Sequence, residues 1–582
     1  MADPGTADAG TADAGSVAGT GVAGQRVTGR AIDVRHGAVV SVSAAASEAG
    51  RDVLMRGGNA VDAAVATAFA LAVTFPEAGN IGGGGFMLVR PADGKEAVMI
   101  DYRETAPAAA AADMFARARA DAGGGPSQHL LVGVPGTVRG LALAHEKFGK
   151  RPWRELVEPA IALAESGFVL NQDSADSLNE ALARPGAEAD EMRRVLGKPM
   201  AGSAGGTGAG DKWAAGDRLV QPELAATLRQ IAEGGPSAFY DGPVAQAIVE
   251  TVRGGGGIIT ASDLRQYQAK VREPVRGTFR GYDIIAPPPP TSGGITLVQM
   301  LNTLEPLGLR ERGRWSPETL HLVIEIMRRA YLDRARHLGD PDFVPIPPHL
   351  TTKQHATKVA AGIDPKRATR SDALAPDLLG AGRDNESPQT THFSVYDASG
   401  MAVSNTYTIE QRYGGRVMVR GMGFLLNNEM GDFNPRPGRT DRLGRIGTPP
   451  NDAAPGKRML SSMTPLIVAR DGRVVMVTGS PGGRTIINTV LWVLLNRLEF
   501  EMSPRESIDA PRFSQTWMPD VVTAERALLA DHARPVEALR QMGHTIVPSP
   551  TPQGDAHTLF IDPDGTIHAV ADDRRDGSAA GY

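Results

Sequence analysis

The sequence contains no cysteine, and this absence removes several kinds of chemistry. Without thiols the chain has no disulfides, no thiolate nucleophile, and no cysteine-ligated zinc or iron–sulfur site. The absence does not fix a compartment, because a protein without thiols tolerates either redox environment.

Long hydrophobic runs and strong charge are missing as well. No run of about 18 apolar residues is present, so we expect no membrane span. The net charge of -5 is small for 582 residues and gives no electrostatic reason to expect nucleic acid as a partner. Residues 1–30 are rich in Ala, Gly, Thr and Asp and lack the basic start and apolar region of an export signal. We therefore expect a disordered leader and, from the sequence, a cytoplasmic protein.

The remaining composition is that of an ordinary globular protein, with 41% hydrophobic and 22% charged residues. Helical spacing is frequent in the first part of the chain, for example over 153–161 and 317–337, whereas short strand-like runs dominate 390–582. The most glycine-dense point is 79–86. Because no Gly-Lys-Ser/Thr follows it, close backbone packing is a better interpretation than a phosphate-binding loop.

One predicted hairpin organises the second part of the chain. Residues 392–396 alternate polar and apolar side chains, and turn residues separate them from a second strand-like run over 401–408. A three-residue loop that ends at Gly400, in the left-handed conformation, fixes the register. In that register Thr390 lies opposite Thr408, at the open end of the hairpin.

A single threonine is usually an ordinary β-branched strand residue, but the setting of Thr390 is unusual. It follows a polar segment, 380–389, that contains Gly and Pro, and it begins a strand directly. Cleavage before Thr390 would place a free α-amine on the residue that carries the hydroxyl. Because an α-amine titrates at about pH 8, it can act as the base for an otherwise weak nucleophile.

Residues 389–397 (Gln-Thr-Thr-His-Phe-Ser-Val-Tyr-Asp), followed by 406–408 (Thr-Tyr-Thr), resemble the γ-glutamyltranspeptidases, or glutathione hydrolases. These are N-terminal-nucleophile enzymes made as single-chain precursors that cut themselves. The resemblance extends from residue 37 to residue 582. It implies an α+β fold, a four-layer αββα sandwich (the N-terminal-nucleophile hydrolase fold) with two stacked antiparallel sheets.

The same resemblance implies how the chain is processed. Cleavage between Gln389 and Thr390 would give a large chain, 31–389, and a small chain, 390–582, which stay together as a heterodimer. Thr390 would then be the nucleophile, and Thr408 would polarise or orient it. We expect no metal and no other cofactor.

A second motif lies at 101–107 (Asp-Tyr-Arg-Glu-Thr-Ala-Pro). An arginine after a buried strand is most often a surface residue or part of a structural ion pair. This run matches a family signature, however, and the resemblance implies that Arg103 holds the α-carboxylate of the substrate. The residue type is suitable, because a guanidinium offers a planar fork to a carboxylate.

Glu429 and Asp432 lie three residues apart after an apolar run. Such acids are usually just solvated, and a metal site is not expected because further oxygen ligands at a suitable spacing are missing. The resemblance implies that they bind the α-ammonium of the substrate together with Glu410. Many family members carry Asn at position 410 and Gln at position 429. The pocket should therefore be unusually acidic, and one carboxyl should titrate high when the site is empty.

A second hairpin is predicted from residues 463–470 and 473–479, which flank Asp471-Gly472, a strong two-residue turn signal. Regular pairing from this turn puts Met463 opposite Ser480. The residues just before the first strand and just after the second strand therefore converge.

These converging residues are a serine pair, Ser461 and Ser462, and a glycine pair, Gly482 and Gly483. The resemblance implies that the serines bind the α-carboxylate and that the glycines donate backbone N–H groups to an oxyanion. Glycine suits this role because it lets the backbone approach the reacting carbonyl closely.

The chain between the two hairpins is expected to form short strands at 417–419 and 424–426, followed by a long loop at 434–458. The loop is rich in Pro, Gly and Arg and contains no aromatic residue. By position it corresponds to the family's lid over the pocket, and we expect a more open or polar cover.

The implied activity is transfer of the γ-glutamyl group of glutathione, or of a related compound, to water or to an amino acid or peptide. A related acylase that acts on a cephalosporin side chain is the nearest rival, and Glu410, Glu429 and Asp432 argue against it. A non-catalytic binding protein on a decayed enzyme scaffold is a different class, against which the intact Thr390 and glycine pair argue. Family members are often exported, in contrast to the absence of a visible signal.

Overall fold

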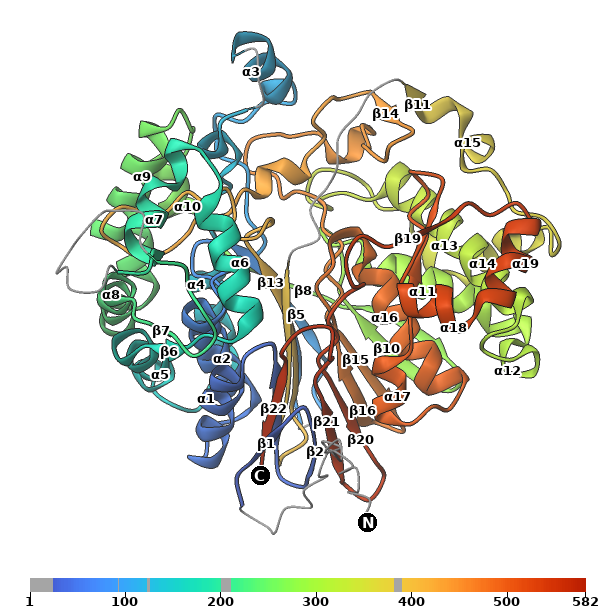
Figure 1. Cartoon of the computed structure of the whole chain (residues 1–582), viewed down its shortest axis with the longest axis horizontal. Coiled ribbons are helices and arrows are strands. Elements are labelled where there is room, and N and C mark those ends of the chain that lie inside the picture. The colour runs from blue at the N-terminus through green and yellow to red at the C-terminus, as the bar shows by residue number, and fades with distance from the viewer. Residues whose placement is uncertain (1–24, 93, 123–125, 200–210, 381–389) are drawn as a thin grey trace, which may run out of the picture.

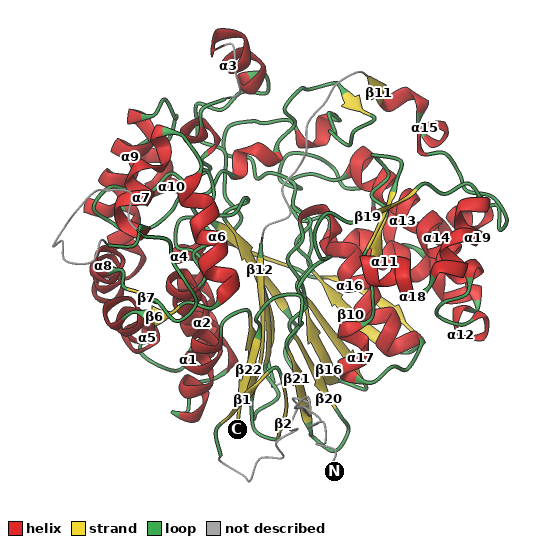
Figure 2. Cartoon of the chain, in the orientation of Figure 1, coloured by secondary structure: helices red, strands yellow, loops and turns green. Residues whose placement is uncertain are grey.

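The computed structural model describes residues 25–92, 94–122, 126–199, 211–380 and 390–582. Two antiparallel β-sheets are stacked face to face at the centre of the protein (Figure 1). Figure 2 shows that helices cover the outer side of each sheet, with the strands between them. The four-layer αββα sandwich predicted from the resemblance is confirmed.

The first sheet has eight strands and holds the predicted hairpin at its centre. Strands β12 and β13 come from the second part of the chain, and they lie between strands from the first part. In spatial order the strands are β1 (Val27–Gly29), β22 (Ser578–Gly581), β3 (Ala38–Ser41), β12 (Thr391–Tyr396), β13 (Ala402–Thr408), β4 (Gly84–Arg90), β5 (Val98–Asp101) and β8 (Lys270–Arg272).

The second sheet has seven strands and holds the second predicted hairpin, formed by β15 and β16. Apolar side chains such as Val40, Leu88 and Ile467 fill the space between the two sheets. In spatial order the strands are β2 (Ala31–Val34), β21 (Ile567–Val570), β20 (Thr558–Ile561), β16 (Arg473–Thr478), β15 (Leu466–Arg470), β10 (Tyr282–Ala286) and β9 (Val275–Phe279).

Each helical layer packs on its sheet through its own apolar core. The helices on the side of the first sheet are α1 (Ala44–Met55), α2 (Ala60–Thr74), α3 (Met114–Ala122), α4 (Thr137–Phe148), α5 (Trp153–Ser166), α6 (Gln172–Ala183), α7 (Asp190–Leu196), α8 (Pro222–Tyr240), α9 (Pro243–Gly254) and α10 (Ala261–Gln266). Those on the side of the second sheet are α11 (Gly293–Leu304), α12 (Leu309–Arg312), α13 (Pro317–His337), α14 (Lys353–Ala361), α15 (Ser371–Leu374), α16 (Ile486–Leu494), α17 (Pro504–Asp509), α18 (Arg526–Asp531) and α19 (Ala533–Gln541). Small sheets join β11 (Leu379–Gly380) to β14 (Thr440–Asp441), β6 (Phe168–Val169) to β7 (Arg218–Leu219), and β17 (Phe513–Ser514) to β18 (Val522–Ala524) and β19 (Ile546–Pro548).

Helix α2 shows how the sequence specifies its place in the fold. Asn59 and Asp62 form a reciprocal capping box at its start, which satisfies backbone N–H groups that have no partner inside the helix. Every residue of α2 is buried, as its apolar composition on all faces predicts.

Among the described residues, no helix is both long enough and apolar enough to cross a membrane.

The register of the first hairpin is confirmed. Thr391 pairs with Tyr407 and Tyr396 pairs with Ala402, and continuing this register places Thr390 opposite Thr408. Gly400 has a φ of +90°, the left-handed conformation expected at the end of the loop.

The second hairpin is confirmed at its turn but not at its open end. Asp471 and Gly472 both have positive φ, as a type I′ turn requires. A β-bulge between Val468 and Ala469 then shifts the register, so that Leu466 pairs with Thr478. The predicted pairing of position 463 with position 480 is therefore wrong by one residue, because the prediction assumed a ladder without a bulge.

Two other expectations need correction. Residues 417–419 and 424–426 do not form strands, although Met418 and Leu425 make an isolated antiparallel bridge. The leader expected over residues 1–30 is too long, because Val27–Gly29 form β1 and pair with β22 at the other end of the chain. Residues 1–24 lie outside the described residues.

Candidate active site

A cavity of about 390 Å³ lies where the open ends of the two hairpins meet. It collects every catalytic and substrate-binding position that sequence reasoning singled out, from both parts of the chain; Gln389, at the predicted cleavage site, lies outside the described residues. The positions in the cavity are Arg103, Thr390, Thr408, Glu410, Glu429, Asp432, Ser461, Ser462, Gly482 and Gly483.

Thr390 lies directly before β12 at the cavity wall, and only 4% of its surface is exposed. The end of the neighbouring strand is held by Asn80, whose side-chain N–H donates to the carbonyl of Thr408 at 3.0 Å. Asn80 Oδ1 in turn accepts from the backbone N–H of Gly83 at 2.9 Å. A Cβ on Gly83 would come within 2.0 Å of the Thr408 carbonyl, so the glycine-dense segment provides close packing, as expected, and fixes the position of Thr408.

The glycine pair lies just beyond the bulged hairpin. Gly482 has a φ of +135° and Gly483 a φ of +54°, and the first value is one that residues with a side chain rarely adopt. Thr485 closes a tight turn here, because its backbone N–H and its hydroxyl both donate to the carbonyl of Gly482, at 3.1 and 2.8 Å. The turn places both glycines on the cavity wall.

Arg103 is the centre of the acidic end of the cavity, which we define as Arg103 with Glu410, Glu429 and Asp432. Glu104 does not line the cavity but lies 3.7 Å from Arg103. The guanidinium of Arg103 is 1% exposed, donates to Glu429, and donates to Asp432 at 2.5 Å. Burial opposes its charge, but Glu429, Asp432 and Glu104 together raise the pKa of Arg103 above its ordinary value. One arginine therefore faces three carboxyl groups, those of Glu104, Glu429 and Asp432, and the excess of acids suits a bound cation.

Two of these carboxyls have raised pKa values. Burial, against the opposing charge of Arg103, raises the pKa of Glu429 well above its ordinary value, and Glu104, Asp432 and Glu410 add to the rise. The expectation that one carboxyl titrates high is thus confirmed, although burial contributes more than repulsion. Burial also raises the pKa of Glu104 to about 7, even though Arg103 lies 3.7 Å away.

The raised pKa of Glu104 predicts how stability depends on pH. Between its ordinary pKa of 4.5 and the folded value of about 7, the folded protein keeps a proton that the unfolded chain has lost. Stability should therefore fall as pH rises through this window. Replacing Glu104 by Gln removes the titration, and since neither carboxylate oxygen has a hydrogen-bond partner among the described residues, no bond is lost. We expect the thermal midpoint of Glu104→Gln to change less between pH 5 and 8 than that of the wild type. Equal slopes for the two proteins would contradict this prediction.

Glu410 adopts an unusual backbone conformation, with a φ of +76°. A left-handed conformation costs a residue with a long side chain roughly 1–2 kcal/mol, whereas Asn adopts it readily. Glu410 therefore places a carboxyl group on the cavity wall at a cost in backbone conformation.

Replacing Glu410 by Asn is expected to raise the free energy of unfolding by about 0.5–1 kcal/mol, because the strain is relieved. Chemical denaturation measures this change. Glu501→Asn is a matched control, since Glu501 is exposed, has a φ of +54° and lies outside the cavity. It should give a similar gain without altering donor binding. A Glu410→Asn protein that is less stable than the wild type would show that the carboxylate stabilises the site.

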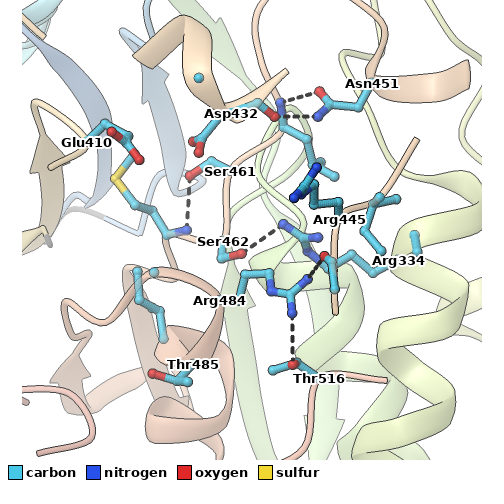
Figure 3. Close-up of a pocket in the computed structure, with 18 of the residues that line it drawn as sticks. Arg334, Glu410, Asp432, Arg445, Asn451, Ser461, Ser462, Arg484, Thr485 and Thr516 are labelled. Atoms are coloured by element: carbon cyan, nitrogen blue, oxygen red, sulfur yellow. Dashed lines mark hydrogen bonds between the residues drawn. The ribbon is translucent and has the colours of Figure 1, made fainter. Parts of the chain in front are cut away.

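The serine pair contacts an arginine that sequence reasoning did not assign to the site. Arg334, on α13, donates to Ser462 Oγ at 2.9 Å and to Ser292 Oγ at 2.8 Å (Figure 3). Arg103 instead contacts the acids. The sequence contains no local signal for the contact between Arg334 and Ser462. Arg334 has the spacing of an ordinary helical residue, and it lies 128 residues away from Ser462 in the chain.

The 434–458 loop forms one wall of the cavity through residues such as Leu443, Arg445 and Thr448. Two side-chain hydrogen bonds hold its shape: Asn434 donates to the Thr448 carbonyl at 2.6 Å within the loop, and Asn451 donates to the Asp432 carbonyl at 2.7 Å, just before the loop. Sequence reasoning also missed Arg445 and the neighbouring Arg484. The arginine-rich composition of the loop was the signal for Arg445, and the position directly after Gly482 and Gly483 was the signal for Arg484.

The chain is similar to known proteins over most of its length. A family model described as "Gamma-glutamyltranspeptidase" matches residues 46–582. The chain is 40% identical to a glutathione hydrolase proenzyme from Escherichia coli (strain K12), over 95% of this chain and 93% of that protein. It is 37% identical to an acylase ACY 1 proenzyme from Pseudomonas sp. (strain SE83), over 93% of each chain. The structure of a cephalosporin acylase from Bacillus halodurans has the same fold, with a TM-score of 0.80 and 24% identity over 95% of this chain and 97% of that one.

Proposed function

The chain belongs to the γ-glutamyltranspeptidase family, and on this premise we propose that it is a glutathione hydrolase proenzyme. It cuts itself between Gln389 and Thr390 into chains 31–389 and 390–582, which remain together. The mature enzyme then transfers a γ-glutamyl group to water or to the amine of an amino acid or peptide. One observation carries the proposal: a single cavity joins the Thr390 position, two glycine N–H groups and an end with an excess of carboxylates.

The donor's γ-glutamyl part carries an α-ammonium and an α-carboxylate, and each has a suitable partner in the cavity. The ammonium enters the acidic end, where the carboxyl groups of Glu410, Glu429 and Asp432 outnumber the single guanidinium of Arg103 and can accept its N–H groups. The carboxylate is held by the hydroxyls of Ser461 and Ser462, supported by the guanidinium of Arg103. Charge-assisted hydrogen bonds of this kind orient the donor as well as bind it.

The chemistry then requires one nucleophile, one base and one oxyanion site. Thr390 Oγ1 attacks the γ-carbonyl carbon, and its proton passes to the α-amine that cleavage has freed on the same residue. The N–H groups of Gly482 and Gly483 stabilise the negative oxygen. The ammonium of Thr390 returns the proton to the leaving amine, which departs and leaves a γ-glutamyl ester. Thr408 orients the nucleophile, and water or an acceptor amine then cleaves the ester.

Two measurements test the proposal together. Purified protein should run as two fragments on a denaturing gel, and the smaller fragment should begin at Thr390. It should also release aniline from a γ-glutamyl anilide, with and without a dipeptide acceptor. An intact chain with no turnover would refute the proposal.

A cephalosporin acylase is the second candidate, because an acylase proenzyme is 37% identical over nearly the same length. An acylase of that kind has no need to bind an ammonium. The carboxyls around Arg103, of which Glu104 and Glu429 are buried, argue for an amine-bearing donor instead. Turnover of a glutaryl anilide above that of the γ-glutamyl anilide would favour the acylase.

A further inference from the structure

Two hydroxyl groups hold the backbone of the glycine pair, one from each side of it in the chain. The hydroxyl of Thr485 donates to the carbonyl of Gly482 at 2.8 Å. The hydroxyl of Ser480 donates to the carbonyl of Pro481 at 2.8 Å. Ser480 is fully buried and does not line the cavity, and sequence reasoning gave it no role in the site.

Each of these carbonyls belongs to the same peptide group as the N–H of one glycine. The peptide group between Pro481 and Gly482 carries the N–H of Gly482, and the next one carries the N–H of Gly483. Because a trans peptide group is planar, its C=O and its N–H point in opposite directions. A hydrogen bond that fixes the carbonyl on one side therefore fixes the direction of the N–H on the other side.

The conformation of Gly482 brings the two N–H groups together. Its ψ of 17° is nearly eclipsed, so the nitrogens of Gly482 and Gly483 lie on the same side of the Cα–C bond of Gly482. Successive N–H groups in a turn of this kind form a concavity that suits an anion. Within the described part of the chain, the structure gives no hydrogen bond from either N–H, and both glycines line the cavity.

Glycine makes this arrangement easy to lose. A glycine adopts positive and negative φ about equally well, so the peptide groups on either side of Gly482 can rotate at little cost. The freedom that lets the backbone approach a reacting carbonyl also lets the N–H turn away from it. The hydrogen bonds from Ser480 and Thr485 oppose that rotation, because it would break them.

Ser480 is itself held in place. The backbone N–H of Asp555 donates to Ser480 Oγ at 2.9 Å, so the hydroxyl accepts one hydrogen bond and donates the other to Pro481. The chain at Gly554 packs directly on the hydroxyl, since a Cβ added there would lie 2.6 Å from Ser480 Oγ. Both hydrogen-bonding capacities of Ser480 are thus used, and its direction is fixed from below the turn.

We propose that Ser480 is a positioning residue for the oxyanion site. By holding the carbonyl of Pro481, it aims the N–H of Gly482 at the oxygen on which negative charge develops. The inference rests on the proposed function and goes beyond it, because Ser480 touches neither the substrate nor the reacting atoms. Its hydroxyl acts in formation of the ester and in its cleavage, since both steps pass through a tetrahedral intermediate at the same carbon.

The test is Ser480→Ala, assayed with a γ-glutamyl anilide and expressed per mole of cut chain. We expect kcat to fall roughly 10- to 100-fold, because the N–H is displaced without being removed, and KM to stay within about twofold. Ser480→Thr keeps the hydroxyl and should recover most of kcat. A threonine variant as slow as the alanine variant would count against the hydroxyl.

A γ-boronic acid analogue of glutamate gives a second readout that packing alone would not change. Thr390 Oγ1 forms a bond to boron, its proton passes to the α-amine of Thr390, and boron becomes a tetrahedral anion. Such an adduct resembles the transition state and needs the same N–H groups. The inhibition constant of the analogue should therefore rise in Ser480→Ala by about the factor by which kcat falls.

Ser404→Ala is the matched control. Ser404 is fully buried outside the cavity lining, its hydroxyl donates to the carbonyl of Thr478 at 2.9 Å, and it accepts from the N–H of Leu466 at 2.9 Å. Its replacement removes the same two kinds of hydrogen bond. It should lower the thermal midpoint about as much as Ser480→Ala does, without changing kcat or the affinity for the boronic acid.

Ser480→Cys carries the test if Ser480→Ala yields no cut chain, because a thiol has a similar shape but is a weak donor. It should show the same loss of kcat. An unchanged kcat, a rise in KM alone, or equal losses of kcat in Ser480→Ala and Ser404→Ala would overturn the positioning role. Absence of cut chain from both the alanine and the cysteine variants would also overturn it, by assigning the hydroxyl to folding or processing. A wild-type protein without turnover would instead overturn the proposed function, and this inference with it.

Discussion

A Thr390→Ala protein is expected to remain one uncut chain and to lose all measurable γ-glutamyl transfer. Both losses have the same cause, because the hydroxyl that would attack the preceding peptide bond is also the hydroxyl that would attack the donor. Removal of a nucleophile in enzymes of this general kind costs roughly four to six powers of ten in kcat. A denaturing gel and γ-glutamyl anilide turnover measure the two effects on one preparation.

Thr390→Ser is the matched control, because it keeps a hydroxyl on the same backbone. It should still split before residue 390 and should keep part of the activity. If Thr390→Ala splits at the same bond, the self-cleavage assignment is wrong. If Thr390→Ala stays intact but the serine variant is also intact and inactive, the position matters for packing and not for its hydroxyl.

Replacement of Gly482 by Ala is expected to lower kcat by roughly 100- to 1000-fold with little change in KM, the size seen when one oxyanion donor is lost. At a φ of +135° a Cβ is strained, and it would lie 2.9 Å from Thr485 Oγ1. The turn must therefore shift, and the N–H group moves away from the developing charge. Because the donor is bound by the acidic end and the serines, its affinity should change little.

Gly472→Ala is the control for this experiment. Gly472 lies in the turn between β15 and β16, at the end of that hairpin away from the cavity, and has a φ of +76°. A Cβ added there would meet open space, so only the backbone conformation is strained. The replacement should reduce stability by about 1 kcal/mol without affecting kcat. Equal kcat losses in both variants would show that Gly482 acts through stability and not through the oxyanion.

The features that the sequence predicted correctly are those set by short-range rules. Period-two alternation and turn chemistry are local, so the register that pairs Thr391 with Tyr407 follows from the residues of the hairpin alone. The bulge at Val468 does not, because it depends on how the strand packs within its sheet. The strand at Val27–Gly29 was missed for a related reason: it exists through pairing with Ser578–Gly581, at the opposite end of the chain.

The same distinction between local sequence rules and long-range packing applies to the candidate site. The catalytic and substrate-binding positions named from motifs all line one cavity. They could be named from the sequence because each motif is recognised from its own local residues. Their mutual contacts were less predictable. Arg103 contacts Glu429 and Asp432, whereas Arg334 contacts Ser462, and such pairings depend on the relative placement of distant elements. The left-handed backbone of Glu410 was also not foreseeable, since Glu has no preference for it.

The interleaving of the two sheets has a consequence for the protein that the proposed cleavage would produce. Strands β12 and β13 lie between β3 and β4, and the strands from β21 to β15 lie between β2 and β10, so both sheets alternate between the two pieces. The pieces then cannot separate by dilution, because separation would break both sheets and expose the core. After complete unfolding, however, recovery becomes a second-order reaction between two polypeptides. The yield of refolding should depend on protein concentration for the cut enzyme and be independent of it for an uncut variant.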